Sequence, residues 1–235
     1  MVSLTAHAII ERARNEGRVF LTEVESKELL GEAGISVIPA RLAKTPQEAA
    51  AIGRELGFPV ALKIASPDIV HKSDSGGVRL GLATPEQVVE AGDAMLKETA
   101  REYPLAAVQG LSVQAMAPPG TEVIIGMARD AQFGPVLMFG LGGIWVEVLK
   151  DISLRVTPLT RRDAREMIEE IRGFPVLRGE RGREPADITA LEDMLLAVSA
   201  FVAGNPAVRE LDLNPVIAFG NGAVAVDARI VLEEK

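Results

Sequence analysis

The sequence predicts an α+β fold, with a small N-terminal lobe of helices and short strands and a larger, strand-rich C-terminal lobe. Three capping-box patterns, beginning at Thr22, Thr45 and Thr84, mark helix starts in the first hundred residues. From Ala106 onward, short apolar runs separated by glycine and proline turns are typical of strands. The last two apolar runs flank residues 220–222, Gly-Asn-Gly, and Asn-Gly between such runs indicates a hairpin.

The predicted elements divide the chain near residues 102–104. The predicted strands are Val60–Ala65, Val78–Leu82, Ala107–Met116, Glu122–Ala128, Pro135–Phe139, Ile144–Leu149, Glu210–Ala218 and Ala223–Ile230. The later predicted helices are Arg161–Ile171 and Ile188–Ala203, with an exposed loop between them at Gly173–Pro185. We therefore expect a helical segment over residues 1–20, an N-terminal lobe over 21–104 and a C-terminal lobe over 105–235.

The composition narrows the possible sites and partners. The 235 residues are 48% hydrophobic and 25% charged, as in ordinary soluble globular proteins. Without cysteine the chain has no disulfide, thiolate metal site or cysteine nucleophile, and we expect an intracellular, cytoplasmic protein. A net charge of −8, with only one Trp and one Tyr, argues against a nucleic-acid partner. No run is long and apolar enough to cross a bilayer, so we expect no membrane partner.

Residues 61–82, ALKIASPDIVHKSDSGGVRLGL, combine three features that favour nucleotide chemistry. Lys63 lies inside an apolar strand, either as a solvent-facing lysine of an edge strand or as a cation for phosphates. His71 lies on a polar loop, where it is either solvated or able to carry a proton, a metal or a phosphoryl group. Gly76 and Gly77 would let backbone N–H groups approach phosphate oxygens. Because neither common nucleotide fingerprint is present, a nucleotide must bind by another architecture.

The C-terminal hairpin carries a candidate metal site. Asp212 and Asn214 are two residues apart on one predicted strand, so both side chains point to the same face. Asp227 lies on the returning strand, roughly opposite Asn214 if the turn closes the hairpin. Two carboxylates and an amide are hard oxygen ligands, which suit Mg²⁺ with waters and phosphate oxygens completing its shell. The alternative is that these are polar residues flanking a turn, but acidic groups inside apolar strands favour the metal.

Residues 134–151, GPVLMFGLGGIWVEVLKD, form a further candidate segment, which Arg155 follows. Its glycines by themselves are consistent with simple turns. Glu147, however, lies in an apolar run, and Asp151 and Arg155 follow closely. Buried charges of both signs usually pair with one another or hold a ligand.

Together these motifs resemble the ATP-grasp subunit of ADP-forming acyl-CoA synthetases, and in particular the separate β chain of ADP-forming acetyl-CoA synthetases, which are relatives of succinyl-CoA synthetase. The resembling stretches, in the family's order, are Ala61–Leu82, Gln114–Gly126, Phe133–Leu159, Leu177–Asp187 and Leu211–Asp227. The resemblance covers nearly the whole chain from about Leu21. It implies an ATP-grasp fold, two α/β lobes with the nucleotide between them, in which the N-terminal lobe carries the His71 loop and the C-terminal lobe the metal-binding hairpin.

The resemblance also implies a reaction and a partner. In this family acyl-CoA, ADP and phosphate are interconverted with the free acid, CoA and ATP. A partner α chain carries the CoA-binding domain and the first phosphorylated histidine, in an assembly expected to be an α2β2 heterotetramer. No Rossmann-type CoA-binding domain is recognisable in this sequence, so full turnover should need that second polypeptide.

By matching motifs, the resemblance assigns the nucleotide contacts. His71 would be a second histidine that takes the phosphoryl group within this chain, and Lys63 would contact the phosphates of ATP or ADP, helped by the amides of Gly76 and Gly77. A linker strand would meet the adenine through Gln114, Ala115, Met116 and Ala117. Glu122 matches a polar position near the nucleotide.

The remaining assignments concern the metal and the phosphoryl group. Asn214 and Asp227 match magnesium ligands of the related succinyl-CoA synthetase, so Mg²⁺ is the implied cofactor. Asp212 matches an acidic position that contacts the incoming phosphohistidine loop, although aspartate here has a shorter reach than glutamate there. Arg155 is a candidate for holding the transferring phosphoryl group.

Two other functions remain open. A self-contained ATP-grasp ligase would activate a carboxylate as an acyl phosphate, and His71 would then be dispensable. A non-catalytic, ATP-sensing module would regulate a partner, but every candidate catalytic residue is present, which disfavours it. Neither the acyl substrate nor a preference for ADP over GDP follows from the sequence.

Overall fold

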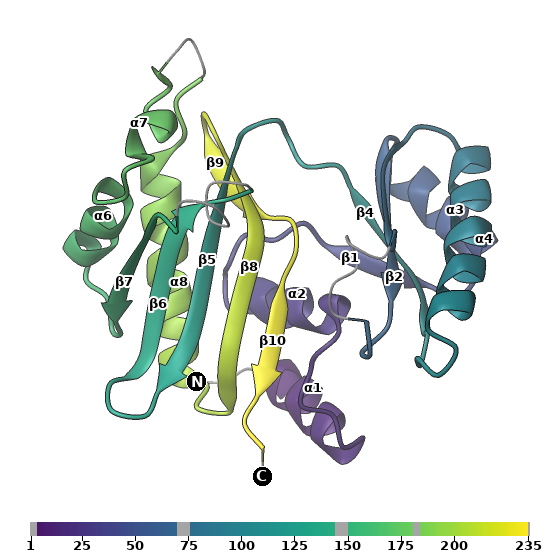
Figure 1. The fold of residues 1–235 in the computed structure, drawn as a ribbon, viewed down its shortest axis with the longest axis horizontal. Coiled ribbons are helices and arrows are strands. Elements are labelled where there is room, and N and C mark those ends of the chain that lie inside the picture. Colours follow the sequence, from purple (N-terminus) through teal and green to yellow (C-terminus); the bar gives the residue numbers. More distant parts are fainter. Residues whose placement is uncertain (1–3, 70–75, 144–149, 181–183, 235) are drawn as a thin grey trace. The chain divides into compact units, whose positions relative to one another are not determined.

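The computed structural model describes residues 4–69, 76–143, 150–180 and 184–234. The chain forms two compact units, shown in Figure 1. The larger unit comprises Met1–Leu21, Glu25–Val37 and Ala117–Lys235, and the smaller unit comprises Thr22–Val24 and Ile38–Met116. The ranges expected from the sequence (1–20, 21–104 and 105–235) stay a prediction about domains, and the compact units are divided at other points.

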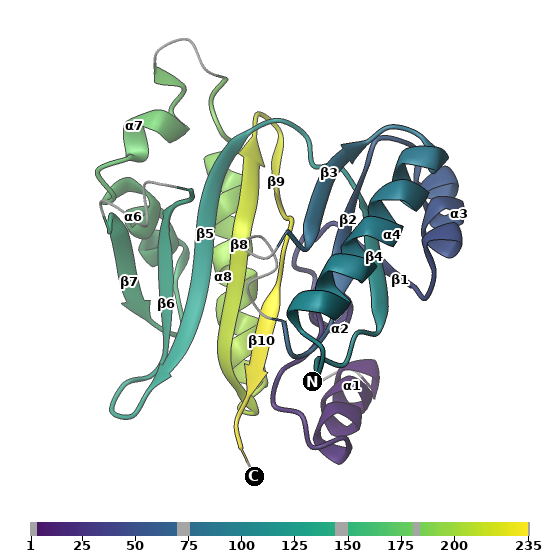
Figure 2. The same cartoon turned by 45° about the vertical axis from the view of Figure 1, so that its right-hand side comes forward.

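The smaller unit is an antiparallel sheet with two helices on one face. Among its described residues the sheet has four strands in the order β1-β4-β2-β3. Its elements are β1 (Ala40–Ala43), α3 (Pro46–Leu56), β2 (Val60–Ala65), β3 (Val78–Leu82), α4 (Pro85–Glu102) and β4 (Gly110–Ala115). Figure 2 shows α3 and α4 together on one side of these strands.

Local sequence signals explain these helices. The Thr45 and Thr84 side chains accept hydrogen bonds from the backbone N–H groups three residues later, so two of the predicted capping boxes do start helices. A Cβ added at Gly92 would lie 2.9 Å from Leu111 Cδ1, so only glycine lets α4 approach the sheet this closely.

The larger unit is built on a second antiparallel sheet. Within the described residues its strand order is β10-β8-β5-β6-β7, with β9 paired to β8. The strands are β5 (Thr121–Asp130), β6 (Gly134–Leu141), β7 (Ile152–Val156), β8 (Val208–Phe219), β9 (Gly222–Ala225) and β10 (Arg229–Leu232). The helices are α1 (Leu4–Asn15), α2 (Glu23–Glu32), α6 (Arg161–Glu169), α7 (Phe174–Leu177) and α8 (Ile188–Gly204), and the first two residues of α2 belong to the smaller unit.

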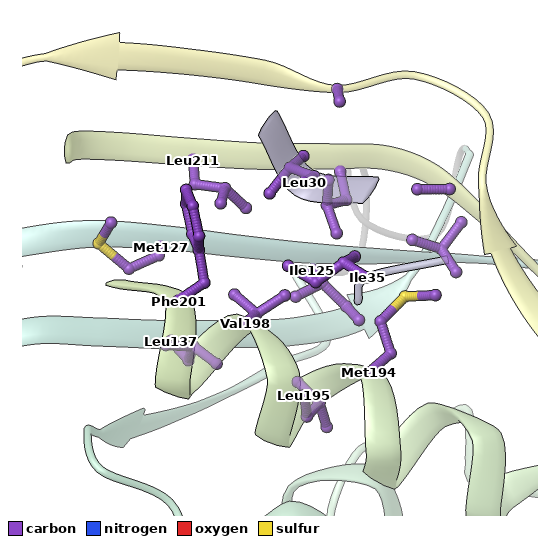
Figure 3. Packing of buried hydrophobic residues seen from close by; sticks show 14 of the residues in the cluster. Leu30, Ile35, Ile125, Met127, Leu137, Met194, Leu195, Val198, Phe201 and Leu211 are labelled. Atoms are coloured by element: carbon purple, nitrogen blue, oxygen red, sulfur yellow. The ribbon is translucent and has the colours of Figure 1, made fainter. Parts of the chain in front are cut away.

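Alternation along the strands places the core of the larger unit on one face of its sheet. Figure 3 shows side chains of β5, β6 and β8, including Ile125, Leu137 and Leu211, packed against Val198 and Phe201 of α8. Residues of α1 and α2 belong to the same cluster. The face of the sheet with these apolar residues is called the core face below, and the opposite face, which carries Glu122, Asp212 and Asn214, is called the second face.

Most predicted elements agree with the structure, but the strands β1 (Ala40–Ala43) and β7 (Ile152–Val156) are not among those predicted, and β4 begins at Gly110 instead of Ala107. The returning strand expected at Ala223–Ile230 is two strands, β9 and β10, which end and begin on either side of residues 226–228. The loop expected at Gly173–Pro185 contains the short helix α7, whose Leu177 is fully buried. The strand expected at Ile144–Leu149 lies outside the described residues.

None of the helices in the described part of the chain combines the length and hydropathy that a membrane span needs.

Candidate functional site

Lys63 is a buried cation at the centre of the smaller sheet. Its ammonium donates to the Glu23 carboxylate (Nζ–Oε1 2.7 Å), and the two side chains are only 4% and 3% exposed. Strand β2 lies between β4 and β3, so the alternative of a solvent-facing lysine on an edge strand is wrong. Because a buried ammonium needs an anionic partner, the carboxylate accounts for how the fold tolerates Lys63.

The structure places the predicted glycine pair just before β3, the strand that pairs with the Lys63 strand β2. Lys63 pairs with Val78, and the N–H of Ile64 donates to the carbonyl of Gly77 (2.9 Å). Gly76 has a φ of 66°, a left-handed conformation that glycine adopts without steric cost. The two features expected to contact phosphates are therefore adjacent in the fold.

The predicted adenine-contacting segment is the end of β4. Gln114 is buried there, paired with Ala40 on one side and Ala61 on the other. Ala61 and Lys63 are two residues apart on β2, so Gln114 shares the sheet face of Lys63. After Met116 the chain leaves the smaller unit at Ala117. His71 lies outside the described residues, so its position is not described.

On the larger sheet, the three predicted metal-site residues come together on the second face, opposite the core. Leu211 and Leu213 of β8 face the core, so Asp212 and Asn214 face the other way. Strand β8 pairs with β9 before residues 226–228 and with β10 after them, in the same register: Val216 pairs with Ala225, and Asp212 pairs with Arg229. Between these pairs, the Val226 N–H donates to the Pro215 carbonyl (2.9 Å). The same register puts Asn214 opposite Asp227, as the hairpin pattern predicted. The Asp227 carboxylate also accepts from the Ala228 N–H (2.8 Å).

An irregularity in the sheet lies at this point. The pairing of β5 with β8 shifts register between Val123 and Ile125, opposite Asn214 and Pro215. Such bulges are frequent next to active sites because they re-aim a side chain and interrupt pairing. The interruption leaves Asn214 exposed and Asp227 partly exposed, so both can reach a ligand.

The charges around Asp212 fit a bound cation. Burial raises the pKa of Asp212 above its ordinary value, the nearby Asp227 carboxylate raises it further, and Arg229 opposes the shift. No cluster of three or more His, Cys, Asp or Glu side chains able to hold a metal is found in the described part of the chain. Asp212, Asn214 and Asp227 would offer two carboxylates and an amide, a set that suits Mg²⁺ because this ion keeps waters and takes few protein ligands.

We expect Asp212→Asn to stabilise the metal-free chain. The substitution removes a partly buried negative charge that burial and Asp227 disfavour, while Arg229 keeps a second carboxylate, Glu210, at 4.0 Å. Thermal unfolding in EDTA at neutral pH should show a melting temperature higher by roughly 2–4 °C. An equal or lower melting temperature would mean that the attraction between Asp212 and Arg229 outweighs the burial of the charge.

Glu122 lies on the second face of the sheet, like Asp212 and Asn214, and beside a glycine turn. Val123 and Ile125 face the core, so Glu122 points the other way, as Asp212 does on the neighbouring strand. The N–H of Gly142 donates to the Glu122 carbonyl (2.8 Å), and a Cβ added at Gly143 would lie 3.6 Å from Glu122 Oε2. A Cβ added at Gly142 would lie 3.0 Å from Glu122 Cβ, so glycine at this position lets the chain pass close to Glu122.

Arg155 is not brought together with the metal-site residues. It pairs with Leu137, a core residue, so it lies on the core face, and β7 is three strands from β8, about 14 Å away at normal strand spacing. Its guanidinium makes two hydrogen bonds to the Glu170 carboxylate (2.8 and 2.6 Å), which raise its pKa. The bidentate pair ties β7 to the end of α6, and the phosphoryl-binding role of Arg155 stays a prediction that this geometry does not favour.

We expect Arg155→Ala to act on stability alone. Loss of a partly exposed bidentate pair should lower the melting temperature by a few degrees, and nucleotide affinity should stay within about twofold of wild type. Calorimetric titration with ADP beside a melting curve would measure both. A tenfold loss of affinity at unchanged melting temperature would restore the phosphoryl-binding role.

Asp151, singled out with Arg155, also has a structural partner. Its carboxylate accepts from the backbone N–H groups of Arg172 and Gly173 (2.8 and 2.7 Å), at the turn before α7. Glu147 lies outside the described residues.

Two charged residues next to the predicted ones, one in each unit, were not predicted from the sequence. Glu23 follows Thr22 in a capping-box pattern, so its local context indicated only a helix start, and nothing nearby signals a partner 40 residues away. Arg229 faces Asp212, and its spacing of two residues from Asp227 on the returning strand is the signal that could have found it.

Comparison with known proteins identifies the fold and the family. The model of the ATP-grasp domain matches residues 12–232. The β subunit of acetate–CoA ligase [ADP-forming] I from Pyrococcus furiosus is 45% identical over 227 residues, 97% of each chain. The chain belongs to the family of ADP-forming acetate–CoA ligase β subunits. It has the ATP-grasp fold, as the resemblance implied.

Other members place the same unit in a longer chain. The acetate–CoA ligase [ADP-forming] I of Archaeoglobus fulgidus is 46% identical over 98% of this chain, which corresponds to 33% of that protein.

An acetyl-coenzyme A synthetase of Ca. Korarchaeum cryptofilum, solved with coenzyme A and Ca-AMPCP, matches with a TM-score of 0.95 at 46% identity, covering 97% of this chain and 100% of that one. Another structure of that synthetase holds Mg-AMPPCP with its phosphohistidine segment pointing towards the nucleotide site.

Proposed function

We propose that this chain is the nucleotide-binding subunit of an ADP-forming acyl-CoA synthetase, which transfers a phosphoryl group between a phosphohistidine and ADP or ATP. The observation that carries the proposal is the 45% identity, over 97% of both chains, to an acetate–CoA ligase β subunit. The overall reaction interconverts acyl-CoA, ADP and phosphate with the free acid, CoA and ATP.

A partner chain supplies the rest of the reaction. The Pyrococcus relative is a β subunit, and the Archaeoglobus relative contains the equivalent of this chain as one third of a single polypeptide. The partner would bind CoA and carry the first phosphorylated histidine, and the assembly would be an α2β2 heterotetramer.

The phosphates would be bound by the smaller sheet. Lys63 supplies a compact positive charge there, and the amides of Gly76 and Gly77, just before the adjoining strand, supply neutral donors. The end of β4, Gln114–Ala117, would meet the base. Phosphoryl transfer spreads negative charge over three oxygens, so the main task of these groups is to position the phosphates and stabilise that charge.

The metal would be held by Asn214 and Asp227. When bound, Mg²⁺ would neutralise charge on the nucleotide phosphates. Asp212, beside them, would meet the partner's phosphohistidine loop, and Glu122 on the same sheet face would lie near the nucleotide. Arg229 opposite Asp212 limits the repulsion among these carboxylates while no cation is present.

His71 would accept the phosphoryl group within this chain. A neutral imidazole nitrogen attacks the γ-phosphorus of ATP, a P–N bond forms, the P–O bond to ADP breaks and ADP leaves. An ordinary imidazole, with a pKa of about 6.5, is mostly neutral at pH 7 and therefore able to attack.

The proposal is tested by incubating the purified chain with Mg²⁺ and γ-labelled ATP. We expect a label on the protein that is lost in acid and kept in base, as a phosphohistidine requires, and that ADP removes to regenerate ATP. If the chain binds ATP and is never labelled, with or without a CoA-binding partner, the relay is refuted. An acyl phosphate-forming ligase or an ATP-sensing module would then be the better explanation.

A further inference from the structure

Lys63 is held by a residue from a distant part of the chain. The Glu23 carboxylate, at the first position of α2, accepts a hydrogen bond from the Lys63 ammonium at 2.7 Å, and both residues belong to the smaller unit. Both side chains are almost fully buried, at 3% and 4% exposure. The pair therefore lies where water weakens the attraction least.

The neighbours of Lys63 on its sheet face are neutral. Ser112 lies directly opposite on β4, and Ala61 and Gln114 lie two residues along on the same face. Ser112 Oγ is buried without a hydrogen-bond partner, so it offers Lys63 no charge and no hydrogen bond. Glu23 places a compensating charge at hydrogen-bond distance from the ammonium.

Stability alone does not account for this pair. Replacing a buried ion pair by apolar residues is often neutral or stabilising, so such a pair inside a sheet is weak evidence of a purely structural role. A lysine side chain has a flexible four-carbon stem with many rotamers, so an unrestrained ammonium is a poor fixed point for a phosphate. A carboxylate that fixes it removes this cost in advance.

We infer that Glu23 is a positioning residue that fixes the Lys63 ammonium, in charged form, for the phosphates of the nucleotide. This inference rests on the proposed function, since it assumes that Lys63 contacts those phosphates. An ammonium has three N–H donors, so a hydrogen bond to one carboxylate oxygen is compatible with a further bond to a phosphate oxygen.

The test is a double-mutant cycle on ADP affinity at saturating Mg²⁺, measured by isothermal titration calorimetry. Glu23→Gln keeps the shape and removes the charge, and we expect about tenfold weaker binding, the effect of losing a hydrogen bond to a charged group. Lys63→Met should weaken binding at least as much. Because Glu23 acts only through Lys63, the double variant should bind no more weakly than Lys63→Met alone.

A second buried carboxylate provides a control. Glu192 of α8, in the larger unit, is 1% exposed and accepts from Arg161 (3.1 Å) and Arg165 (2.7 Å) of α6, two side chains that are 55% and 57% exposed. Glu192→Gln should lower the melting temperature, because it weakens the contacts of α8 with α6, and leave ADP affinity within twofold.

The outcomes separate the inference from the function. If Glu23→Gln lowers only the melting temperature, or if its effect adds in full to that of Lys63→Met, the positioning role is refuted. If the wild-type chain does not bind ADP at all, the proposed function itself fails. Should Glu23→Gln not fold, Glu23→Asp keeps the charge with a shorter reach, and we expect about threefold weaker binding. Wild-type affinity in Glu23→Asp would then overturn the inference.

Discussion

Replacing His71 by asparagine is expected to abolish the acid-labile label that γ-labelled ATP leaves on the protein. Asparagine has an amide in place of the imidazole, so no nitrogen nucleophile remains to form the P–N bond. Labelling should fall below detection, at least 10³-fold, while ATP affinity stays within a few-fold of wild type. Denaturing gels under alkaline conditions, beside calorimetric titration with ATP, measure both quantities.

The chain contains a matched control for this prediction. His7 is the other of its two histidines and is exposed on α1. His7→Asn should be labelled like wild type. Label that persists in His71→Asn and disappears in His7→Asn would move the phosphoryl acceptor to α1, and label in neither single variant would indicate a loss of folding that melting curves would reveal.

Removal of the Asp227 carboxylate is expected to have the second largest effect. Asp227→Ala deletes a proposed magnesium ligand opposite Asn214. It leaves the Asn214 amide oxygen, which binds Mg²⁺ more weakly than a carboxylate does. We expect the Mg²⁺ concentration for half-maximal ADP binding to rise at least tenfold, since even residues that only orient metal ligands cost about 10- to 100-fold when changed. A series of ADP titrations at increasing Mg²⁺ measures the shift.

Asp130 is the matched control for Asp227. It lies in the same unit at the end of β5, and its carboxylate likewise accepts backbone N–H groups, those of Gln132 and Phe133. Asp130→Ala should leave the Mg²⁺ dependence unchanged. An equal rise in both variants would mean that local destabilisation, and not loss of a metal ligand, is being measured.

Much of the site could be predicted because its chemistry lies in short segments with regular periodicity. The two-residue alternation of strands put Asp212 and Asn214 on one face, and the Gly-Asn-Gly turn put Asp227 opposite Asn214. Local capping chemistry marked the helix starts at Thr45 and Thr84. These features depend on neighbours within a few residues or on one tight turn.

Other parts of the site depend on contacts between segments far apart in the chain. Whether Lys63 was a solvent-facing or a buried lysine depended on the strand order, because β3 and β4 flank β2 only in the folded sheet. The division into compact units likewise follows contacts that join residues before Val37 to residues after Ala117. Local patterns carry no information about such pairings.

The sequence alone predicts the α+β class, the hairpin that brings Asp212, Asn214 and Asp227 together and, through its motifs, the ATP-grasp family. The contact of Glu23 with Lys63 and the position of Arg155 on the core face, paired with Glu170, became apparent only in the folded chain. Periodicity determines which residues share a face of one element, whereas the partner of a buried charge depends on the packing of elements distant in sequence.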